Sequence, residues 1–373
     1  MERYLGESIP KLGFGLMRLP MQEGKIDIAQ VREMVDLFMD AGFRYFDTAY
    51  GYNDGDSERA AKAALVDRYP RDSFYLATKL PAWTAKTEAD AKQMFYTSLE
   101  RTGAKYFDFY LLHNIGRGRL EFFDNFGIWD FLAERKKEGL IRHLGFSAHC
   151  TPEMLEEVLT KHPDMEFVQL QINYADWESE GVQARKCYEV ARAHGKPVVI
   201  MEPVKGGMLA KLPEGAAAPL RSAAPEKSLS SWALRFAASL DGLVTVLSGM
   251  SSVEQMKENI ALMKDLPPFT EAERRALDET RTYLASVPQV PCTGCSYCTK
   301  GCPQSIPIPD IFTAYNQYKI YENLTAAQRF YGFVTRGGQK ASTCVECGQC
   351  ESVCPQSIRI IEELKNAAKV FDD

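Results

Sequence analysis

The chain has little of several features that mark common protein classes. It carries 44 Lys and Arg against 50 Asp and Glu, a formal net charge of −6, and no basic stretch. This balance disfavours nucleic acid as a partner, because binding to a phosphate backbone requires a basic surface. No apolar run approaches the roughly 20 residues that span a membrane, and Met1–Leu5 lack the apolar core of a secretory signal. We therefore expect a cytoplasmic protein that has neither a membrane nor a nucleic acid as its partner.

Cysteine, in contrast, is concentrated near the C-terminal end. Eight of the ten cysteines lie in two runs with the same spacing, C-x2-C-x2-C-x3-C-P. This spacing is typical of ferredoxins that carry two 4Fe–4S clusters. Zinc needs only one four-ligand set per site and does not explain the Cys-Pro endings, and a disulfide framework is typical of secreted chains. The pattern therefore predicts two 4Fe–4S clusters, with Cys150 and Cys187 left as ordinary buried thiols.

The two runs also form an internal repeat, since both end in the identical stretch Cys-Pro-Gln-Ser-Ile. In two-cluster ferredoxins, the fourth cysteine of each run binds the cluster of the other run. This rule predicts two crossed ligand sets, which are Cys292, Cys295, Cys298 and Cys354 for one cluster and Cys344, Cys347, Cys350 and Cys302 for the other. We expect a ferredoxin-type iron–sulfur domain over residues 286–373.

The preceding part of the chain alternates short apolar runs with amphipathic stretches. Eight such units favour an α/β fold in which parallel strands with right-handed crossovers close as a TIM (β/α)8 barrel, here over residues 1–285. An open doubly wound sheet is the alternative, but Gly13-Phe-Gly15 is too short for the glycine-rich fingerprint of that fold. One expected helix covers residues 122–139, and the expected strands cover residues 12–17, 44–48, 74–79, 107–113, 143–147, 167–172, 197–202 and 243–248.

Polar side chains stand at the ends of three successive predicted strands, where TIM barrels carry their active sites. They are Asp47 at the second strand with Tyr52 shortly after it, Lys79 at the third and His113 at the fourth. These four residues resemble the catalytic tetrad of the aldo-keto reductases, and the resemblance extends over residues 11–266. With the cysteine runs, the chain looks like the branch of that family that has a C-terminal two-cluster ferredoxin-type domain.

The chemistry of these side chains fits carbonyl reduction, which needs hydride at the carbon and a proton at the oxygen. Tyr52 can donate the proton, although a phenol with an ordinary pKa of about 10 is a poor acid at neutral pH. Lys79, held charged and oriented by Asp47, supplies a cation that lowers this pKa. His113 can polarise the carbonyl oxygen through a hydrogen bond. A lone Tyr or Lys at a strand end is usually only a rim residue, so the prediction rests on all four together.

The resemblance also implies contacts to a nicotinamide cofactor. Ser147 and Gln171 match residues that hold the carboxamide, and Met201 stands where an aromatic ring usually covers the nicotinamide. Met201 is equally compatible with a core position. Lys205 could offer a charge to the phosphates, and the loop and helix after the eighth strand contribute further candidates, which are Gly249, Ser251, Ser252, Gln255, Glu258 and Asn259.

The preference between NAD and NADP depends on the loop after the eighth strand. Gln255 stands where family members that prefer NADP usually have an arginine for the 2′-phosphate. Without a cation, discrimination for that phosphate should be weak, so the sequence slightly favours NAD as the NAD(P)H cofactor. Pocket walls in the family come from barrel-top loops, with Met17, Tyr50, Trp83 and Asn114 as the corresponding residues here.

Three functions remain open at the level of sequence. The first is an oxidoreductase that interconverts a small carbonyl compound and its alcohol with NAD(P)H. A nicotinamide moves two electrons and a cluster moves one, so direct exchange between them requires a converter such as a flavin. The second function is therefore an electron-transfer oxidoreductase with FMN in the barrel and an electron-transfer protein as partner. The third is a redox-sensing or partner-binding subunit without turnover, which the intact tetrad disfavours.

Overall fold

The computed structural model describes residues 5–116 and 118–372. Residues 1–4, on which most of the judgement about a secretory signal rests, lie outside the described residues. The chain forms two compact units. Unit 1 comprises the chain up to Pro203 together with Ala233–Pro268, and unit 2 comprises Val204–Trp232 together with the chain from Phe269 onward. The segment Val204–Trp232, which directly follows a barrel strand, thus groups with the C-terminal part of the chain.

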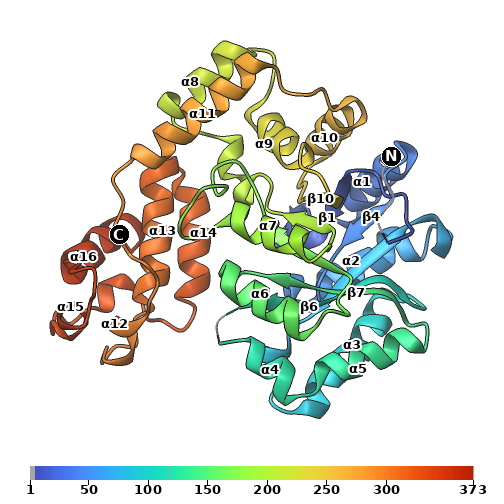
Figure 1. Ribbon diagram of the computed structural model, residues 1–373, viewed down its shortest axis with the longest axis horizontal. Helices are drawn as coiled ribbons and strands as arrows, with labels where there is room; N and C mark the ends of the chain where they lie inside the picture. Colours follow the sequence, from blue (N-terminus) through green and yellow to red (C-terminus); the bar gives the residue numbers. More distant parts are fainter. Residues whose placement is uncertain (1–4, 117, 373) are drawn as a thin grey trace. The chain divides into compact units, whose positions relative to one another are not determined.

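Unit 1 is built around a closed barrel of eight parallel strands (Figure 1). The barrel closes because β1 pairs with β4 on one side and with β10 on the other. This confirms the predicted TIM barrel. The strands are β1 (Leu12–Gly15), β4 (Tyr45–Asp47), β5 (Tyr75–Leu80), β6 (Phe107–Ile115), β7 (Ile141–Ala148), β8 (Phe167–Gln171), β9 (Val198–Met201) and β10 (Leu243–Ser248).

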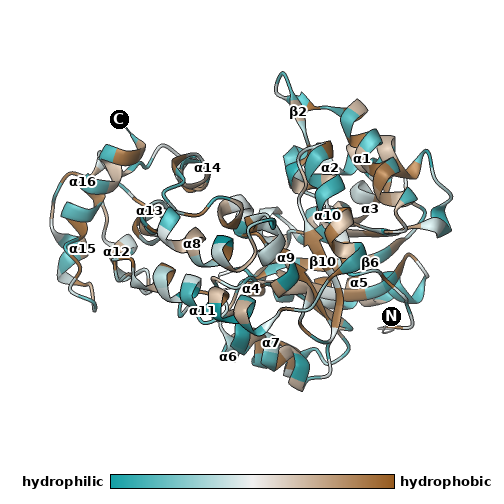
Figure 2. Cartoon of the chain, turned by 90° about the horizontal axis from the view of Figure 1, so that it is seen from above, coloured by the Kyte–Doolittle hydropathy of each residue, from teal (hydrophilic) through white to brown (hydrophobic). Residues whose placement is uncertain are grey.

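The barrel strands are buried on both faces, as expected for a parallel sheet that is covered by helices. Tyr45, Phe109, Phe167 and Val199 belong to one cluster of fully buried side chains. Figure 2 shows apolar colouring along β10 and hydrophilic colouring on much of helices α2 and α7. Gly145 permits the close approach of β7 and β8, because a Cβ there would overlap the carbonyl oxygen of Phe167.

The helices of unit 1 follow the strands and begin at recognisable caps. Asp27, Thr87, Thr151 and Ser252 each accept a hydrogen bond from a backbone amide of the first turn of their helix. The helix expected over residues 122–139 is interrupted, because Gly127 adopts a left-handed φ of 57° and separates two helices. The helices are α1 (Ile28–Asp40), α2 (Asp56–Ala61), α3 (Glu88–Thr102), α4 (Leu120–Asn125), α5 (Ile128–Lys137), α6 (Pro152–Lys161), α7 (Ala184–Ala193) and α10 (Val253–Asp265).

Two short strands and one further helix lie outside the regular alternation of strands and helices. Strands β2 (Met21–Gln22) and β3 (Lys25–Ile26) form a small antiparallel hairpin that the sequence did not predict. Helix α9 (Leu229–Ala238) lies across the boundary between the two units in the sequence.

In unit 2, helix α8 (Glu214–Ala223) packs along helix α11 (Glu271–Ser286), and the two lie side by side in Figure 1. The buried Thr280 hydroxyl donates to the carbonyl oxygen of Ala216 at 2.9 Å. Gly215 faces the ring of Tyr283 so closely that a Cβ at this position would overlap it. These contacts explain why the segment after β9 groups with the C-terminal part of the chain.

The rest of unit 2 repeats one pattern twice. The helices are α12 (Tyr297–Lys300), α13 (Ile308–Tyr321), α14 (Leu324–Val334), α15 (Gln349–Ser352) and α16 (Ile360–Phe371). The short helices α12 and α15 follow left-handed residues, Ser296 and Gly348. A tight turn then leads into α13, where Ile308 N–H donates to Ile306 O at 2.8 Å, and into α16, where Ile360 N–H donates to Ile358 O at 2.9 Å. The repeat in the sequence is therefore a repeat in backbone structure.

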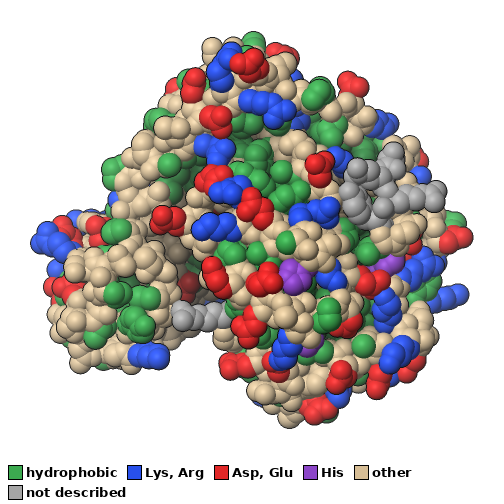
Figure 3. Space-filling model, viewed as in Figure 1, with side chains coloured by type: hydrophobic (Ala, Val, Ile, Leu, Met, Phe, Trp, Pro, Cys, Tyr) green, Lys and Arg blue, Asp and Glu red, His purple; other side chains and the backbone are tan. Residues whose placement is uncertain are grey.

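The surface carries charges of both signs. On the face that Figure 3 displays, Lys and Arg are interspersed with Asp and Glu, and no large area of a single sign gathers there among the described residues. Within residues 5–116 and 118–372, none of the helices combines the length and the apolar character needed to cross a membrane.

Candidate functional site

The four residues of the predicted tetrad converge at the C-terminal ends of adjacent barrel strands. Asp47 is the last residue of β4, and Tyr52 begins the short helix η2 (Tyr52–Gly55) that follows it. Lys79 lies near the end of β5, and His113 lies near the end of β6. Because β4, β5 and β6 are neighbours in the barrel, the fold brings these side chains together.

Lys79 is the centre of this arrangement. Its side chain is almost fully buried, and its ammonium group donates to Asp47 Oδ1 at 2.5 Å and to the carbonyl oxygen of Thr48 at 2.8 Å. The same nitrogen lies 3.4 Å from the Tyr52 hydroxyl. The Thr48 carbonyl was not predicted from the sequence, since a backbone acceptor has no signature in residue type. Two oxygens, from Asp47 and Thr48, thus hold one buried cation beside the phenol of Tyr52.

Burial and charge act in opposite directions on these groups. Burial raises the pKa of Tyr52, and the Lys79 cation opposes this rise without cancelling it. Burial alone would lower the pKa of Lys79, but Asp47 and Tyr52 outweigh it and raise that pKa. The sequence predicts a lowered pKa for Tyr52, and this prediction is wrong for the net shift, which is upward. The contribution of Lys79 alone does lower the pKa, as predicted. Desolvation of the phenolate is the reason for the upward shift.

His113 lies on the other side of Tyr52. The two rings meet edge to face, with their centroids 5.8 Å apart, and the Trp83 ring lies 5.6 Å from that of His113. Burial lowers the pKa of His113 well below its usual value, with the Lys79 cation acting in the same direction. Its Nδ1 atom is buried without a hydrogen-bond partner among the described residues. The imidazole is therefore neutral and retains hydrogen-bonding capacity that the described residues do not use.

The residues predicted to hold a carboxamide lie on the next two strands. Ser147 is buried near the end of β7, and its hydroxyl accepts from the backbone N–H of Asn114 at 2.7 Å. Gln171 ends β8 and donates through Nε2 to Asp176 at 2.8 Å. Asp176, which also accepts from Asn173 at 2.8 Å, was missed in the sequence. Its signal was the Asn173-x-x-Asp176 spacing of a local turn, in which Asn173 Oδ1 accepts from the backbone N–H of Asp176.

Strand β9 and the segment after it place three further residues. Met201 ends the strand and packs, partly buried, against the core cluster of the barrel interior. Glu202 has a left-handed φ of 54° and an exposed side chain, and its charge adds to the rise in the Tyr52 pKa. Lys205 belongs to unit 2, where its ammonium lies 6.0 Å from the ring centroid of Tyr321.

The loop after β10 is held together by its own polar groups. The backbone N–H of Ser251 donates to Gln255 Oε1 at 2.8 Å, and the Ser252 hydroxyl caps helix α10 by accepting from the N–H of Gln255. Asn259 donates from its buried amide to the Ser248 hydroxyl at 3.0 Å. Gly249 and Ser251 are exposed, and so is Glu258 on the first turns of α10. Most of the predicted contact residues in this region are therefore engaged within the loop.

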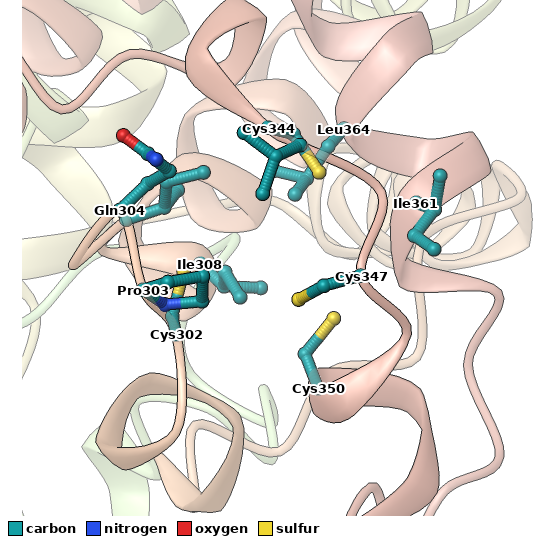
Figure 4. Close-up of a pocket in the computed structure, with 11 residues that line it drawn as sticks. Cys302, Pro303, Gln304, Ile308, Cys344, Cys347, Cys350, Ile361 and Leu364 are labelled. Atoms are coloured by element: carbon teal, nitrogen blue, oxygen red, sulfur yellow. The ribbon is translucent and has the colours of Figure 1, made fainter.

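The eight cysteines of the two runs line two separate cavities in unit 2. One cavity, with an empty volume of about 320 Å³, is lined by Cys302, Cys344, Cys347 and Cys350. Figure 4 shows the sulfurs of Cys344, Cys347 and Cys350 pointing into this space, with Cys302 on the facing segment. The other, also of about 320 Å³, is lined by Cys292, Cys295, Cys298 and Cys354. The fold thus groups three cysteines of each run with the fourth cysteine of the other run.

The chemistry of both cavities fits iron–sulfur clusters. All ten cysteines are described by the structure, and none forms a disulfide. Without iron, burial raises the pKa of Cys298 to about 11, so that binding of a cluster must displace a proton from this thiol. Apolar residues such as Ile308 and Ile360 form part of the wall of the second cavity. Among the described residues, no group of three or more His, Cys, Asp or Glu is placed to hold a single metal ion.

Comparison with known proteins agrees with this organisation. Residues 11–281 match the Aldo/keto reductase family, and residues 291–358 match the 4Fe-4S dicluster domain. The two matches lie on either side of residue 285, and the domain boundary placed there stays a prediction. An uncharacterized oxidoreductase of Bacillus subtilis, YqkF, is 26% identical over 310 residues, which cover 74% of this chain and 95% of that protein.

Solved structures show the same fold. The aldo-keto reductase AKR11C1 from Bacillus halodurans, in its holo form, is 28% identical and superimposes with a TM-score of 0.60, covering 74% of this chain and 95% of that one. An aldo-keto reductase from Klebsiella pneumoniae in complex with NADPH is 22% identical with a TM-score of 0.58, and it covers 72% of this chain and 90% of that one. At 22% identity, the similarity to the Klebsiella pneumoniae structure shows only that the two chains share the barrel fold.

Proposed function

Because the chain belongs to the aldo/keto reductase family and carries a 4Fe–4S dicluster domain, we propose that it interconverts a small carbonyl compound and its alcohol by hydride transfer with a nicotinamide dinucleotide. One observation carries this proposal. The buried ammonium of Lys79 lies 2.5 Å from Asp47 and 3.4 Å from the Tyr52 hydroxyl, at the barrel end where such enzymes place their active sites. A phenol poised against a buried cation is suited to release a proton as negative charge develops on a substrate oxygen.

Different residues of the chain have different roles in the reduction. A bound dihydronicotinamide supplies the hydride to the carbonyl carbon. Tyr52 gives its proton to the carbonyl oxygen, which becomes the alcohol hydroxyl, and Lys79 stabilises the phenolate that remains. Asp47 keeps Lys79 charged and oriented, and solvent returns a proton to Tyr52 after the product leaves. Neutral His113 orients the carbonyl by donating a hydrogen bond, since an imidazole without a charge does not compete as the acid.

The barrel mouth has polar atoms that fit a bound carboxamide or carbonyl. Asn114 Oδ1 and His113 Nδ1 are buried there and lack partners among the described residues, although buried polar atoms are normally hydrogen-bonded. Ser147, held at the end of β7, keeps a hydroxyl proton that it can donate while it accepts from Asn114 N–H. We propose that Ser147, Gln171 and Asn114 bind the carboxamide end of the dinucleotide, with Met201 beside the ring.

For the clusters, we propose the two crossed ligand sets predicted from the sequence, with one set for each four-cysteine cavity. Each cavity has four cysteines and mostly apolar residues in the rest of its wall, which suits a four-iron cluster held by four thiolates. Such clusters would exchange single electrons with an electron-transfer protein. The described residues provide no contact that specifically favours FMN over a nicotinamide, so extraction of bound cofactors decides between the two functions.

The test uses the full-length protein, purified without oxygen, and a panel of small aldehydes and ketones. We expect oxidation of NADH or NADPH that depends on the carbonyl compound, together with formation of the alcohol. Tyr52→Phe should lower kcat by about 100-fold to 10,000-fold, the usual contribution of a general acid, and leave the cluster absorbance unchanged. Tyr96→Phe is the matched control, because Tyr96 is an exposed tyrosine on α3 that bonds Arg135 instead. Unchanged activity in Tyr52→Phe, or stoichiometric bound flavin without nicotinamide-dependent turnover, would overturn the proposal.

A further inference from the structure

The turn that follows β6 places an arginine beside the tetrad. The backbone N–H groups of Arg119 and Leu120 both donate to the carbonyl oxygen of Gly116, at 3.1 and 3.3 Å, so the chain turns back directly after the strand ends at Ile115. His113 lies near the end of the same strand. The turn therefore keeps Arg119, which is half-buried, at the end of the barrel that carries the tetrad.

An aromatic ring links this arginine to the tetrad. The guanidinium carbon of Arg119 lies 4.6 Å from the ring centroid of Trp83, and the Trp83 ring lies 5.6 Å from the imidazole of His113. A guanidinium over an indole uses its face for this contact, while its N–H groups point outward in the plane, where they match a carboxylate in a bidentate geometry. Because one ring contacts both groups, a short molecule is sufficient to span Arg119 and His113.

The charge of Arg119 acts on the imidazole groups at this end of the barrel. Desolvation lowers the pKa of His113, and the cations of Lys79 and Arg119 act in the same direction. At His149, which follows β7, desolvation again lowers the pKa, while Glu202 opposes this shift and Arg119 adds to it. Glu202 follows β9, which β7 and β8 separate from β6. An anion that enters here is therefore attracted to the side of β6 and repelled from the side of β9.

We propose that the carbonyl substrate carries a carboxylate and that Arg119 binds this carboxylate. The proposal rests on the proposed function and names its substrate class. With the carbonyl oxygen between Tyr52 and His113 and the carboxylate at Arg119, the carbon chain of the substrate lies along Trp83. Hydride goes to the carbonyl carbon and the Tyr52 proton goes to its oxygen, so that an oxo acid becomes a hydroxy acid. Arg119 binds the substrate without exchanging a proton, because a guanidinium stays charged in proteins.

The experiment compares oxo acids with their methyl esters, which keep the carbonyl group and the carbon chain but lack the negative charge. Glyoxylate, pyruvate and succinic semialdehyde, each beside its methyl ester, are reduced by the full-length, cluster-containing protein without oxygen. We expect the wild type to have a kcat/KM at least about tenfold higher for one or more of the acids than for the matching ester, as for a gain of charge-assisted hydrogen bonds.

Substitution of the arginine should remove this preference. In Arg119→Gln, we expect kcat/KM for the preferred acid to fall about 10-fold to 100-fold, mainly through KM, and kcat/KM for its ester to change less than about twofold. Arg119→Lys should fall between the two, because an ammonium keeps the charge but loses the bidentate geometry. Arg275→Gln is the matched control, because Arg275 is an exposed arginine on α11 that pairs with Glu271 at 2.8 Å, and it should change neither substrate.

The outcomes separate this proposal from the proposed function. An equal loss for acid and ester in Arg119→Gln would show that Arg119 only supports Trp83 and would overturn the proposal. A wild type that reduces neutral aldehydes or ketones but shows no preference for any of the acids would also overturn it, while the proposed function would stand. If the wild type reduces none of the carbonyl compounds, the proposed function fails and this proposal fails with it.

Discussion

The ammonium of Lys79 lies 2.5 Å from the carboxylate of Asp47 in a place where both side chains are almost fully buried. A buried ion pair of this kind adds little stability compared with well-packed apolar residues, but loss of one partner leaves an uncompensated charge. The position beside Tyr52 gives the pair a chemical role that apolar residues cannot supply. We interpret it as a device that keeps a cation available at a dry site, at a cost in stability that the rest of the barrel offsets.

We predict that Lys79→Met lowers the free energy of unfolding by about 3 to 5 kcal/mol, because Asp47 is then buried without its partner. The double variant Asp47→Leu with Lys79→Met should lose less than the sum of the two single variants, since no buried charge remains. Urea unfolding followed by tryptophan fluorescence under anaerobic conditions measures both quantities. Strictly additive losses would contradict the coupling. Both variants should also lose turnover.

The pH dependence of reduction follows from the shifts at Tyr52 and His113. Burial raises the pKa of Tyr52, so the proton-donating form persists above the ordinary range, and burial lowers the pKa of His113 well below its usual value, so the imidazole stays neutral. Between about pH 6.5 and about pH 10, the ordinary values of the two groups, neither should titrate. We expect kcat/KM for carbonyl reduction to be flat over most of this window. A fall centred near neutral pH that Tyr52→Phe abolishes would show a depressed Tyr52 pKa and contradict the prediction.

The crossed grouping of the cysteines has a consequence for pairs of substitutions. Cys298→Ser with Cys354→Ser changes two cysteines of one cavity, and Cys298→Ser with Cys302→Ser changes one cysteine of each cavity. We expect the first pair to reduce the iron content from about eight to about four per chain and the second pair to reduce it to nearly none. Iron and sulfide analysis with electron paramagnetic resonance of the reduced protein measures this. The opposite ranking would show that each run binds its own cluster.

Gly145→Ala should destabilise the barrel. A Cβ at this position would overlap the backbone carbonyl of Phe167, and a backbone atom of the neighbouring strand cannot move without disturbing the β7–β8 pairing. We expect a loss of about 1 to 3 kcal/mol or more, as for overpacking of a core. Gly51→Ala is the matched control, because Gly51 has a φ of −95° and no atom within 4 Å of an added Cβ. A comparable unfolding midpoint in the two variants would show that the barrel absorbs the clash.

Local signals in the sequence were sufficient to predict the barrel and to predict that polar side chains gather at the C-terminal ends of its strands. Each strand is a short apolar run, and the order of strands follows from the rule that successive parallel units pair side by side. The closed barrel confirms that reading. The break at Gly127 in the helix expected over residues 122–139 was not predicted, because a single glycine within an amphipathic pattern does not reveal a left-handed φ.

The sequence by itself determined the family, the eight strands and the two cysteine runs, because these depend on spacing and periodicity along the chain. Only the tertiary structure decided which distant groups meet. The Thr48 carbonyl beside Lys79 and the Asp176 carboxylate that holds Gln171 are contacts of this kind. The net shift of the Tyr52 pKa was equally hidden, because it is a balance between burial and one neighbouring cation. Such balances depend on distance and desolvation in the folded chain, and residue types alone do not carry them.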